Sequence, residues 1–482
     1  MASKSDAISF IAPIDTDNTM AWSWVGEPSG PSNGQDAPQG PQEVNESGGD
    51  VIPGSVGTSY TLALGATETG VINTPGDDDW FAVQLVAGQH YTFTLVGSGG
   101  SPLVDPYLQL RGSSGELVHF DDDGGSGLSS LMRFTPATSG TYYVNARAWE
   151  DEVSGPSLTG GYTLTFTAGT PQNPLTYIDL PYQFPGSTIA VWFAASGEVN
   201  SGDTAIRNWT AAEMNAVWSV FSTISAVANI NFVAAASNAS ANFVLSIADL
   251  GTNVLGHFFV GVGDGAFDPD GFGWSSSGMA QGSLGYSTIT HEILHGLGLG
   301  HPHYDPGDEV FMQGVTGAFN SFGTFQLNQG VFTTMSYNDG WFTGPMGNGS
   351  NGVTGSQAGP MALDIALLQQ LYGANATHNN GSNTYTLAGA NGAYLAIWDT
   401  GGTDSISYAG SSAVTIDLRP ATLQNGFGGG GYVSYVSGIH GGYTIAAGAV
   451  IENAVGGSNW DTLTGNDANN RFTGNAGFDT IS

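Results

Sequence analysis

Residues 291–303 read HEILHGLGLGHPH, and this stretch carries the strongest chemical signal in the chain. His291 and His295 are four residues apart, so both imidazoles lie on one face of a helix and can reach one Zn²⁺ ion at about 2.0–2.1 Å. Gly298 can adopt a positive φ, which ends the helix and returns His301 as a third ligand. Three neutral ligands leave a fourth position for water, as in catalytic zinc sites.

Glu292 follows the first histidine and is predicted to act as general base on water held at the metal. A bare HExxH pattern is only moderately specific, because it also arises in unrelated helices. The chain has only nine histidines, and a chance match to the extended pattern is well under about one in ten thousand. We therefore set aside the alternative that these are surface histidines without a metal.

A second part of the same site is predicted downstream in TTMSYNDG, residues 333–340. Met335 fits a Met-turn, a hydrophobic floor beneath the zinc that does not coordinate the ion. Tyr337, two residues later, can place its phenol near the metal. A Met-x-Tyr sequence would mean nothing alone, and its place after the zinc motif gives it weight.

Composition limits the possible functions. The 482 residues leave room for about three domains. With 41 acidic residues against 7 basic ones, the formal net charge is −34, which excludes nucleic-acid binding because such a surface repels phosphates. The acidity indicates solubility through charge repulsion, calcium binding, or both.

Cysteine and long apolar segments are both absent from the sequence. Without cysteine there are no disulfides, no thiolate zinc ligands and no cysteine-dependent inhibition of a zymogen. No segment has the length of a transmembrane helix, and residues 1–17 lack the apolar core of a Sec signal peptide. We therefore expect no membrane insertion, and export would depend on another signal.

The N-terminal third divides into two parts. Residues 1–50, rich in Gly, Pro, Ser and acids, are predicted to be a mobile acidic leader. An inhibitory pro-segment, with Asp15 or Asp17 reaching the zinc, is the alternative. Residues 51–168 contain short alternating runs between turn residues, which predicts an antiparallel β-sandwich. This region also holds an acidic run that either binds calcium or forms a solvated turn: Asp121, Asp122 and Asp123.

Residues 169–375 are predicted to form an α/β catalytic domain, entered through a Pro-rich linker. Thr210 and Glu213 form a capping box ahead of apolar residues at helical spacing. The zinc motif lies on a helix over residues 287–297, and a further helix is predicted from about 361 to 372.

Residues 376–482 return to short strands and glycine turns and predict a calcium-binding parallel β-roll. Three consecutive nonapeptides, beginning at Gly456, Gly465 and Gly474, close the sequence. Each carries Asp or Asn at its sixth place and an apolar residue at its eighth. The eighth-place residues are Leu463, Phe472 and Ile481. Because the sequence stops at the close of a repeat, we expect a truncated roll.

Several motifs, taken together and in this order, resemble the serralysin family of metzincin proteases from about residue 175 onward. They are the zinc motif followed by Pro302, the MSY turn, LDIALLQQLYGAN, IWDTGGTD, AAGAVIENAVGGS and the terminal repeats. GDDDWFAVQLVAGQHYTFTL and DPYLQLRGSSGELVHFDDDGG resemble the bacterial pre-peptidase C-terminal domain family. The expected fold is therefore multidomain: an α/β (α+β) metzincin catalytic domain between an N-terminal β-sandwich and a C-terminal parallel β-roll.

The resemblance implies a zinc metalloendopeptidase with one catalytic Zn²⁺ and several structural Ca²⁺ ions. It implies protein or peptide substrates and an extracellular enzyme exported by a Gram-negative type I secretion apparatus. We expect a monomer. Two rival interpretations are an inactive adhesion or surface-layer protein, which the intact zinc motif disfavours, and a zinc hydrolase acting on other substrates.

The resemblance also implies individual metal ligands. Zinc is held by His291, His295 and His301, with Tyr337 as an additional, switchable ligand, while Met335, Gly298 and Pro302 are structural. Calcium at the junction of the two C-terminal regions is assigned to Asn379, Gly381, Asn383, Asp399, Gly401, Gly402, Asp404, Val450 and Glu452. The repeats add Gly456, Ser458, Asp461, Gly474, Ala476 and Asp479. From its residues alone, the turn from Asp399 to Asp404 fits a calcium site and a solvated hairpin equally.

Overall fold

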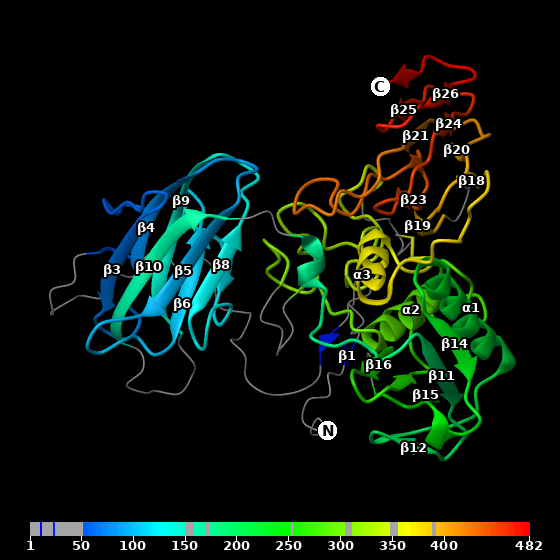
Figure 1. Cartoon of the computed structure of the whole chain (residues 1–482), viewed down its shortest axis with the longest axis horizontal. Helices are drawn as coiled ribbons and strands as arrows, with labels where there is room; N and C mark the ends of the chain where they lie inside the picture. Colours follow the sequence, from blue (N-terminus) through cyan, green and yellow to red (C-terminus); the bar gives the residue numbers. More distant parts are fainter. Residues whose placement is uncertain are drawn as a thin grey trace.

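A computed structural model describes residues 52–149, 159–169, 173–251, 254–303, 311–347, 355–387 and 392–482. It also places the backbone of two short paired strands, β1 (Phe10–Ile11) and β2 (Ser23–Trp24). The rest of the predicted leader, with Asp15 and Asp17, lies outside the described residues. The described chain is multidomain and rich in strands, as expected, with few helices (Figure 1).

The N-terminal region forms two four-stranded antiparallel sheets, which confirms the predicted antiparallel β domain. The first sheet has the order β3 (Thr67–Ile72), β10 (Gly160–Ala168), β5 (Tyr91–Gly97) and β8 (Ser130–Phe134). The second has the order β4 (Asp79–Leu85), β9 (Gly140–Ala148), β6 (Pro106–Arg111) and β7 (Leu117–Asp121). Alternate residues face a shared core, as Phe93 and Phe166 do with rings stacked at 4.6 Å.

The central region is built on a five-stranded sheet that follows a short 3₁₀ helix, η2 (Pro174–Tyr177). The strand order is β14 (Asn231–Ala234), β11 (Thr188–Phe193), β15 (Phe243–Ile247), β17 (Asp264–Phe267) and β16 (Gly256–Phe259). Strand β16 alone runs antiparallel and forms one edge. A small hairpin of β12 (Val199–Asn200) and β13 (Asp203–Thr204) extends from this region.

Three α-helices lie in the described part of the central region. α1 (Ala211–Val227) begins with the predicted capping box of Thr210 and Glu213, and α3 is Ala362–Tyr372. α2 (Leu284–Gly296) begins three residues before the predicted start at residue 287. Gly285 conceals that first turn in the sequence, because its propensity is unfavourable. The structure needs glycine there, since a Cβ would lie 2.7 Å from the carbonyl oxygen of Gly273.

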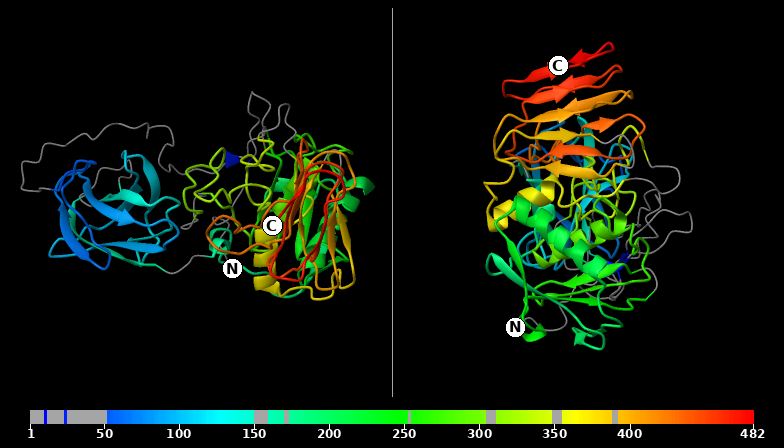
Figure 2. Two further views of the ribbon diagram at one scale, coloured as in Figure 1. Left: turned by 90° about the horizontal axis from the view of Figure 1, so that it is seen from above. Right: turned by 90° about the vertical axis from the view of Figure 1, so that its right-hand side faces the viewer.

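The C-terminal region stacks short strands, most of them parallel, into two sheets. The right-hand view of Figure 2 shows these strands one above another. One sheet contains β18 (Thr384–Thr386), β20 (Ser405–Ser407), β24 (Asn453–Val455) and β26 (Arg471–Thr473). The other contains β21 (Val414–Asp417), β25 (Thr462–Thr464) and β27 (Thr480–Ile481), with β22 (Tyr435–Val436) antiparallel to β21. A separate parallel pair joins β19 (Tyr394–Ile397) to β23 (Gly442–Ile445).

Strand pairing in this region follows the nonapeptide repeats. Ala454 pairs with Phe472, and Leu463 pairs with Ile481, so each partner lies eighteen residues (472 − 454 and 481 − 463) further along the chain. Eighteen residues are two nonapeptides, and successive repeats therefore lie on opposite sheets.

One hydrophobic core extends from the central region into the C-terminal region, which also encloses a second core of its own around Ile406, Ile416 and Leu463. Residues of α1, α2 and α3 pack in the same cluster as Tyr394, Ala421, Val433 and Ala446, whereas the N-terminal sheets enclose a core of their own. Among the described residues, no helix combines the length and hydrophobicity needed to cross a bilayer.

Candidate metal centre

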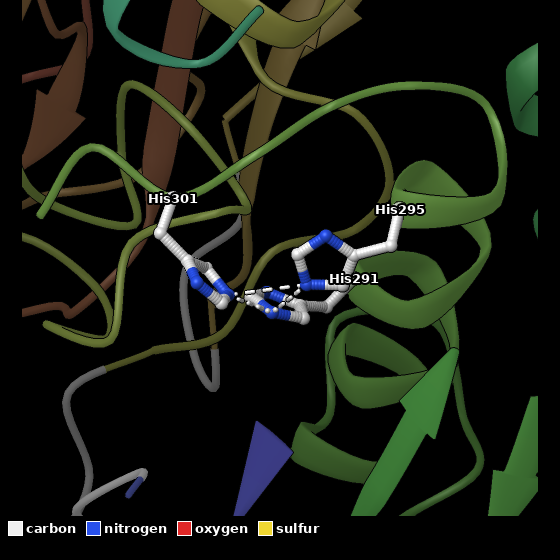
Figure 3. A group of neighbouring side chains, drawn as sticks. All are labelled: His291, His295 and His301. Carbon is white, nitrogen blue, oxygen red and sulfur yellow. Dashed lines mark hydrogen bonds between the residues drawn. The ribbon is translucent and has the colours of Figure 1, made fainter. Parts of the chain in front are cut away.

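The three predicted zinc histidines converge in the interior of the central region (Figure 3). His291 and His295 project from one face of α2, and His301 returns from the loop that follows it. The Nε2 atoms lie 3.0 Å apart for His291 and His301, and 3.1 Å apart for each of the other two pairs. All three side chains are at least 98% buried. The sequence spacing thus brings three imidazole nitrogens to one point.

Gly298 makes this return possible. It has a φ of +99°, two residues after the end of α2. A Cβ at this position would also collide with the carbonyl oxygen of Tyr182. Both the conformation and the close backbone approach therefore require glycine where the sequence analysis placed the turn.

Backbone carbonyls fix the orientation of two of the histidines. Nδ1 of His291 lies 2.8 Å from the carbonyl of Thr334, and Nδ1 of His295 lies 2.7 Å from that of Leu299. Because these Nδ1–H groups donate, each Nε2 presents its lone pair to the centre. Burial lowers the pKa of His291 to about 4 and holds those of His295 and His301 well below the usual range. All three rings are therefore neutral, as metal ligation requires.

This arrangement fits zinc. Zn–N bonds of about 2.0–2.1 Å in a tetrahedron give nitrogen–nitrogen separations of roughly 3.3 Å, close to the distances within the triad. The three neutral imidazoles point nitrogen lone pairs at one another, and there are too few N–H donors among them for a hydrogen bond between each pair of rings. A cation therefore explains the cluster better than hydrogen bonding does. Among the described residues, the triad is one of two groups of three His, Asp or Glu side chains whose ligand atoms all lie within 4.8 Å of one another.

Glu292 is completely buried beside the triad, and the described residues offer neither of its carboxylate oxygens a hydrogen-bond partner. This burial raises its pKa well above the ordinary value. The edge strand β16 passes directly over the side chain, since a Cβ built on Gly256 would lie 3.0 Å from Cγ of Glu292. The carboxyl is thus confined yet free to accept a proton from a bound molecule.

The predicted Met-turn lies next to the triad. Met335 is completely buried, and the preceding residue, Thr334, supplies the carbonyl that orients His291. Asp364 of α3 fixes this turn by accepting the Thr333 hydroxyl at 2.6 Å and the Thr334 backbone N–H at 2.7 Å. Burial raises the pKa of Asp364 to about 6, although these hydrogen bonds oppose the shift.

The sequence analysis missed the role of Asp364. The available signal was its place as an acid at the third position of a helix, where it also accepts the Met361 backbone N–H at 2.9 Å. That signal indicates a helix start and gives no information about the turn 30 residues upstream.

Tyr337 and His303 complete the walls of the site. The Tyr337 ring is buried, with its centroid 4.6 Å from that of His301 and 4.3 Å from that of His303. His303 stacks on His301 at 4.6 Å with an interplanar angle of 10°. The motif contained His303, but spacing alone assigned it no role. Pro302, between these histidines, is buried and accepts the Met312 backbone N–H at 2.8 Å.

Five of the predicted junction calcium residues form hydrogen bonds with one another. Asp404 Oδ1 accepts the backbone N–H of Asn383 at 2.6 Å, and Glu452 accepts that of Asp404 at 2.7 Å. Asp399 accepts the backbone N–H of Gly401 at 3.0 Å. Asp404 Oδ2 is buried without a hydrogen-bond partner among the described residues. Asp404 Oδ2 is therefore available to a cation.

For the other predicted junction residues, the structure shows mainly backbone features. Gly401 and Gly402 have φ values of 142° and 144°, and a Cβ on Gly402 would collide with Gly381. Asn379 has a φ of 48°. The side chain of Val450 is about half exposed and has no oxygen, so its carbonyl is the only group of this residue that suits calcium.

In the repeats, the predicted carboxylates bind backbone amides. Asp461 accepts the N–H groups of Gly457 at 2.7 Å and Val414 at 3.0 Å, while Asp479 accepts that of Asp461 at 3.0 Å. Gly456 and Gly474 lie against the carboxylates of Asp461 and Asp479, so a side chain at either would collide. Ser458 donates to the Gly410 carbonyl at 3.3 Å, and Ala476 is exposed.

The acidic run of the N-terminal region is divided by the fold. Carboxylate oxygens of Asp122 and Asp123 lie within 4.8 Å of each other and of one from Asp105. Asp121 instead accepts the backbone N–H of Leu131 at 2.6 Å. Asp105, from a different turn, was not identified from the sequence.

Comparison with known proteins gives two family matches. The sequence model of the peptidase M10 serralysin C terminal matches residues 363–481. That of the bacterial pre-peptidase C-terminal domain matches residues 77–148. A solved structure of the pre-peptidase C-terminal domain of a collagenase from Bacillus anthracis is 14% identical, covering 22% of this chain and 92% of that chain with a TM-score of 0.18.

Curated relatives include a serralysin from Photorhabdus luminescens, 34% identical over 41% of this chain and 39% of its own length. Serralysin C of Dickeya chrysanthemi is 32% identical over 55% of this chain and 56% of its length. Metallopeptidase AprA of Pseudomonas marginalis is 29% identical over 61% of both chains. The chain thus spans 39–61% of the length of these three relatives. The predicted resemblance is confirmed: the chain is similar to the serralysins, and separate parts of it match the serralysin C-terminal model and the bacterial pre-peptidase C-terminal domain model.

Proposed function

We propose that this chain is a secreted zinc-dependent endopeptidase of the serralysin type, in which residues 169–375 form a metzincin catalytic domain. One observation carries the proposal: three buried, neutral imidazoles converge within 3.0–3.1 Å beside the unpartnered carboxyl of Glu292. A structural metal site needs no such carboxyl, whereas hydrolysis by activated water does. The serralysin relatives support protein or peptide substrates.

His291, His295 and His301 would hold the ion. A bound Zn²⁺ supplies Lewis-acid chemistry, activating water near neutral pH and polarising the scissile carbonyl. Glu292 accepts the proton of the attacking water and returns it to the leaving amine. Burial raises the pKa of this carboxyl, which brings its basicity closer to that of the groups with which it exchanges the proton.

Tyr337 is proposed to stabilise the oxyanion that develops on the scissile carbonyl. Its ring packs against His301 and His303 in the wall of the site, so the phenol is held by packing before substrate binds. A preorganised O–H donor stabilises developing negative charge more than water does, because it need not reorient.

The C-terminal region is proposed to be a β-roll that folds around several calcium ions. The junction cluster of Asp399, Asp404 and Glu452 supports this, since it concentrates acids around a buried carboxylate oxygen without a partner. Calcium would be a folding ligand and would take no part in catalysis. Export by a type I apparatus, an extracellular location and a monomeric state extend the same proposal.

Hydrolysis of casein tests the proposal. Purified protein in calcium buffer is compared with Glu292→Gln, and zinc content is measured on both samples. We expect about one zinc per chain in each, as a three-histidine site requires, and casein cleavage by the wild type alone. Casein cleavage by the variant would remove Glu292 from its role. Zinc without cleavage by the wild type, even after removal of the leader, residues 1–50, would contradict the endopeptidase proposal.

A further inference from the structure

The N-terminal sandwich docks on a segment that lies next to the third histidine in space. Phe311 is 93% buried. Its ring lies 4.7 Å from that of Phe120 and 5.7 Å from that of His119, which both belong to strand β7. Strand β7 is an edge of its sheet. The sandwich therefore covers the ring of Phe311 with the side chains of an edge strand.

A reciprocal pair of hydrogen bonds secures this contact. The Gln313 side chain accepts the backbone N–H of Thr135 at 2.7 Å and donates to the Thr135 carbonyl at 2.6 Å. Both residues are at least 97% buried. A buried amide with both of its functions satisfied fixes one relative position of the two partners, because any displacement breaks both bonds.

The C-terminal region joins the same junction. Asn425 donates to the Gln313 side-chain oxygen and to the Tyr177 hydroxyl, both at 3.3 Å. Tyr177 ends η2, which follows the last strand of the sandwich along the chain. All three of these residues are buried. Three parts of the chain therefore meet around one glutamine.

Two segments from this junction hold His301 on either side. Upstream of the histidine, Gly300 donates its backbone N–H to the carbonyl of Ile178 at 2.8 Å, and Ile178 is next to Tyr177. Downstream, the carbonyl of Pro302 accepts the N–H of Met312 at 2.8 Å, and Met312 is next to Gln313. His291 and His295 lie on a helix in the core, whereas His301 lies on a loop braced by these two contacts.

We propose that Gln313 is a positioning residue, through which docking of the sandwich holds His301 in place for the metal. This rests on the proposed zinc site and extends it. The sandwich is then a structural part of the metal centre rather than a separable attachment. Residues that orient a metal ligand typically affect metal affinity by about 10- to 100-fold, and the same range is expected here.

Four variants of the full-length chain test this. Gln313→Ala and Gln313→Met remove the amide, and the second keeps the side-chain volume. Phe120→Ala loosens the docking from the sandwich side, where its ring packs against Phe311. Val96→Ala, on an exposed position of β5, is the matched control. Each protein is loaded with Zn²⁺ for release into a chelator, and with Co²⁺ for its visible absorption spectrum.

We expect Gln313→Ala, Gln313→Met and Phe120→Ala each to release zinc about tenfold faster or more, with an altered cobalt spectrum, and Val96→Ala to match the wild type. Unchanged release and spectra in the Phe120 and Gln313 variants would overturn the proposal and leave Gln313 a structural tie. If one Gln313 variant fails to fold, the other one and Phe120→Ala still test whether docking of the sandwich positions His301. A wild type that binds no stoichiometric zinc would instead refute the proposed function.

Discussion

Asp364 accepts the backbone N–H of Thr334 at 2.7 Å, and thereby fixes the residue whose carbonyl orients His291. The two residues lie on α3 and on the Met-turn, and the hydrogen bond joins these elements beneath the metal centre. A carboxylate without direct access to the metal thus controls which nitrogen of a ligand carries its proton.

Replacing Asp364 with alanine should weaken both the fold and the metal site. The change leaves the donors of Thr333, Thr334 and Met361 without their acceptor. At roughly 1–3 kcal/mol for each buried unsatisfied group, we expect the free energy of unfolding to fall by about 3 kcal/mol or more. Urea unfolding of the metal-free protein measures this. Asp364→Asn keeps one acceptor oxygen and should lose less, and equal stability of the alanine variant and the wild type would disprove the argument.

Gly256→Ala should lower kcat by roughly tenfold through displacement of Glu292. The new methyl group would lie 3.0 Å from Cγ of Glu292 and 3.2 Å from the carbonyl oxygen of Ala266, so the more mobile side chain must move. Zinc content should be unchanged, since no ligand is touched. Gly317→Ala has open space around its Cβ and serves as the control. A kcat equal to that of the wild type would show that the proposed role of Glu292 tolerates this shift.

Tyr337→Phe should mainly lower kcat, by about 10²- to 10³-fold as for other oxyanion donors, and leave KM nearly unchanged. The phenylalanine keeps the ring contacts with His301 and His303, so folding and zinc content should persist. Steady-state kinetics on a peptide substrate provides the test. An unaltered kcat would make the tyrosine structural.

Removal of calcium should loosen the C-terminal region. Without a cation, the acids around the buried Asp404 Oδ2 repel one another. A ligand at 100 times its dissociation constant stabilises a fold by about 2.7 kcal/mol per site, so EGTA should lower the melting temperature and expose residues 376–482 to proteolysis. Asp404→Ala should reduce the difference between calcium and EGTA buffers. Identical melting curves in both would count against structural calcium.

The acidic cluster of the sandwich should make its stability fall as pH rises in the absence of divalent cations. Burial, followed by repulsion between neighbours, raises the pKa of Asp105 to about 6 and of Asp122 to about 7. A carboxyl whose pKa is higher in the folded state binds its proton more tightly there than in the unfolded chain. Its cost to the stability of the fold is therefore smallest near pH 4 and grows progressively up to pH 7.

Calorimetry in EDTA tests this sign. Asp122→Asn should melt like the wild type near pH 4 and at a higher temperature at pH 7.5. Glu68→Gln, on an exposed position of β3, should show no such trend. The effect is expected to be modest because both aspartates retain some solvent contact. A wild type that gains stability relative to Asp122→Asn as pH rises would reverse the assignment.

The sequence predicted those parts of the site whose positions follow from residues close together along the chain. Histidines four residues apart on a helix, a glycine after it and a nonapeptide period each determine where their side chains point. The sequence analysis did not identify Asp364, His303 or Gln313 as parts of the site. Asp364 and Gln313 act through contacts 30 and 178 residues away, and no period in the sequence encodes such distances. His303 lay within the motif, but its stacking on His301 depends on the path of the loop.

Because successive repeats alternate between two sheets, the number of repeats that precede a strand, odd or even, decides on which sheet it lies. Gain or loss of two nonapeptides keeps every later strand on its own sheet, whereas a single one exchanges the two faces for all residues beyond it. Trp460 and Phe478, whose rings meet at 5.5 Å across two repeats, would then stand on opposite sides. Natural or engineered variation in the length of this region should therefore proceed in steps of eighteen residues.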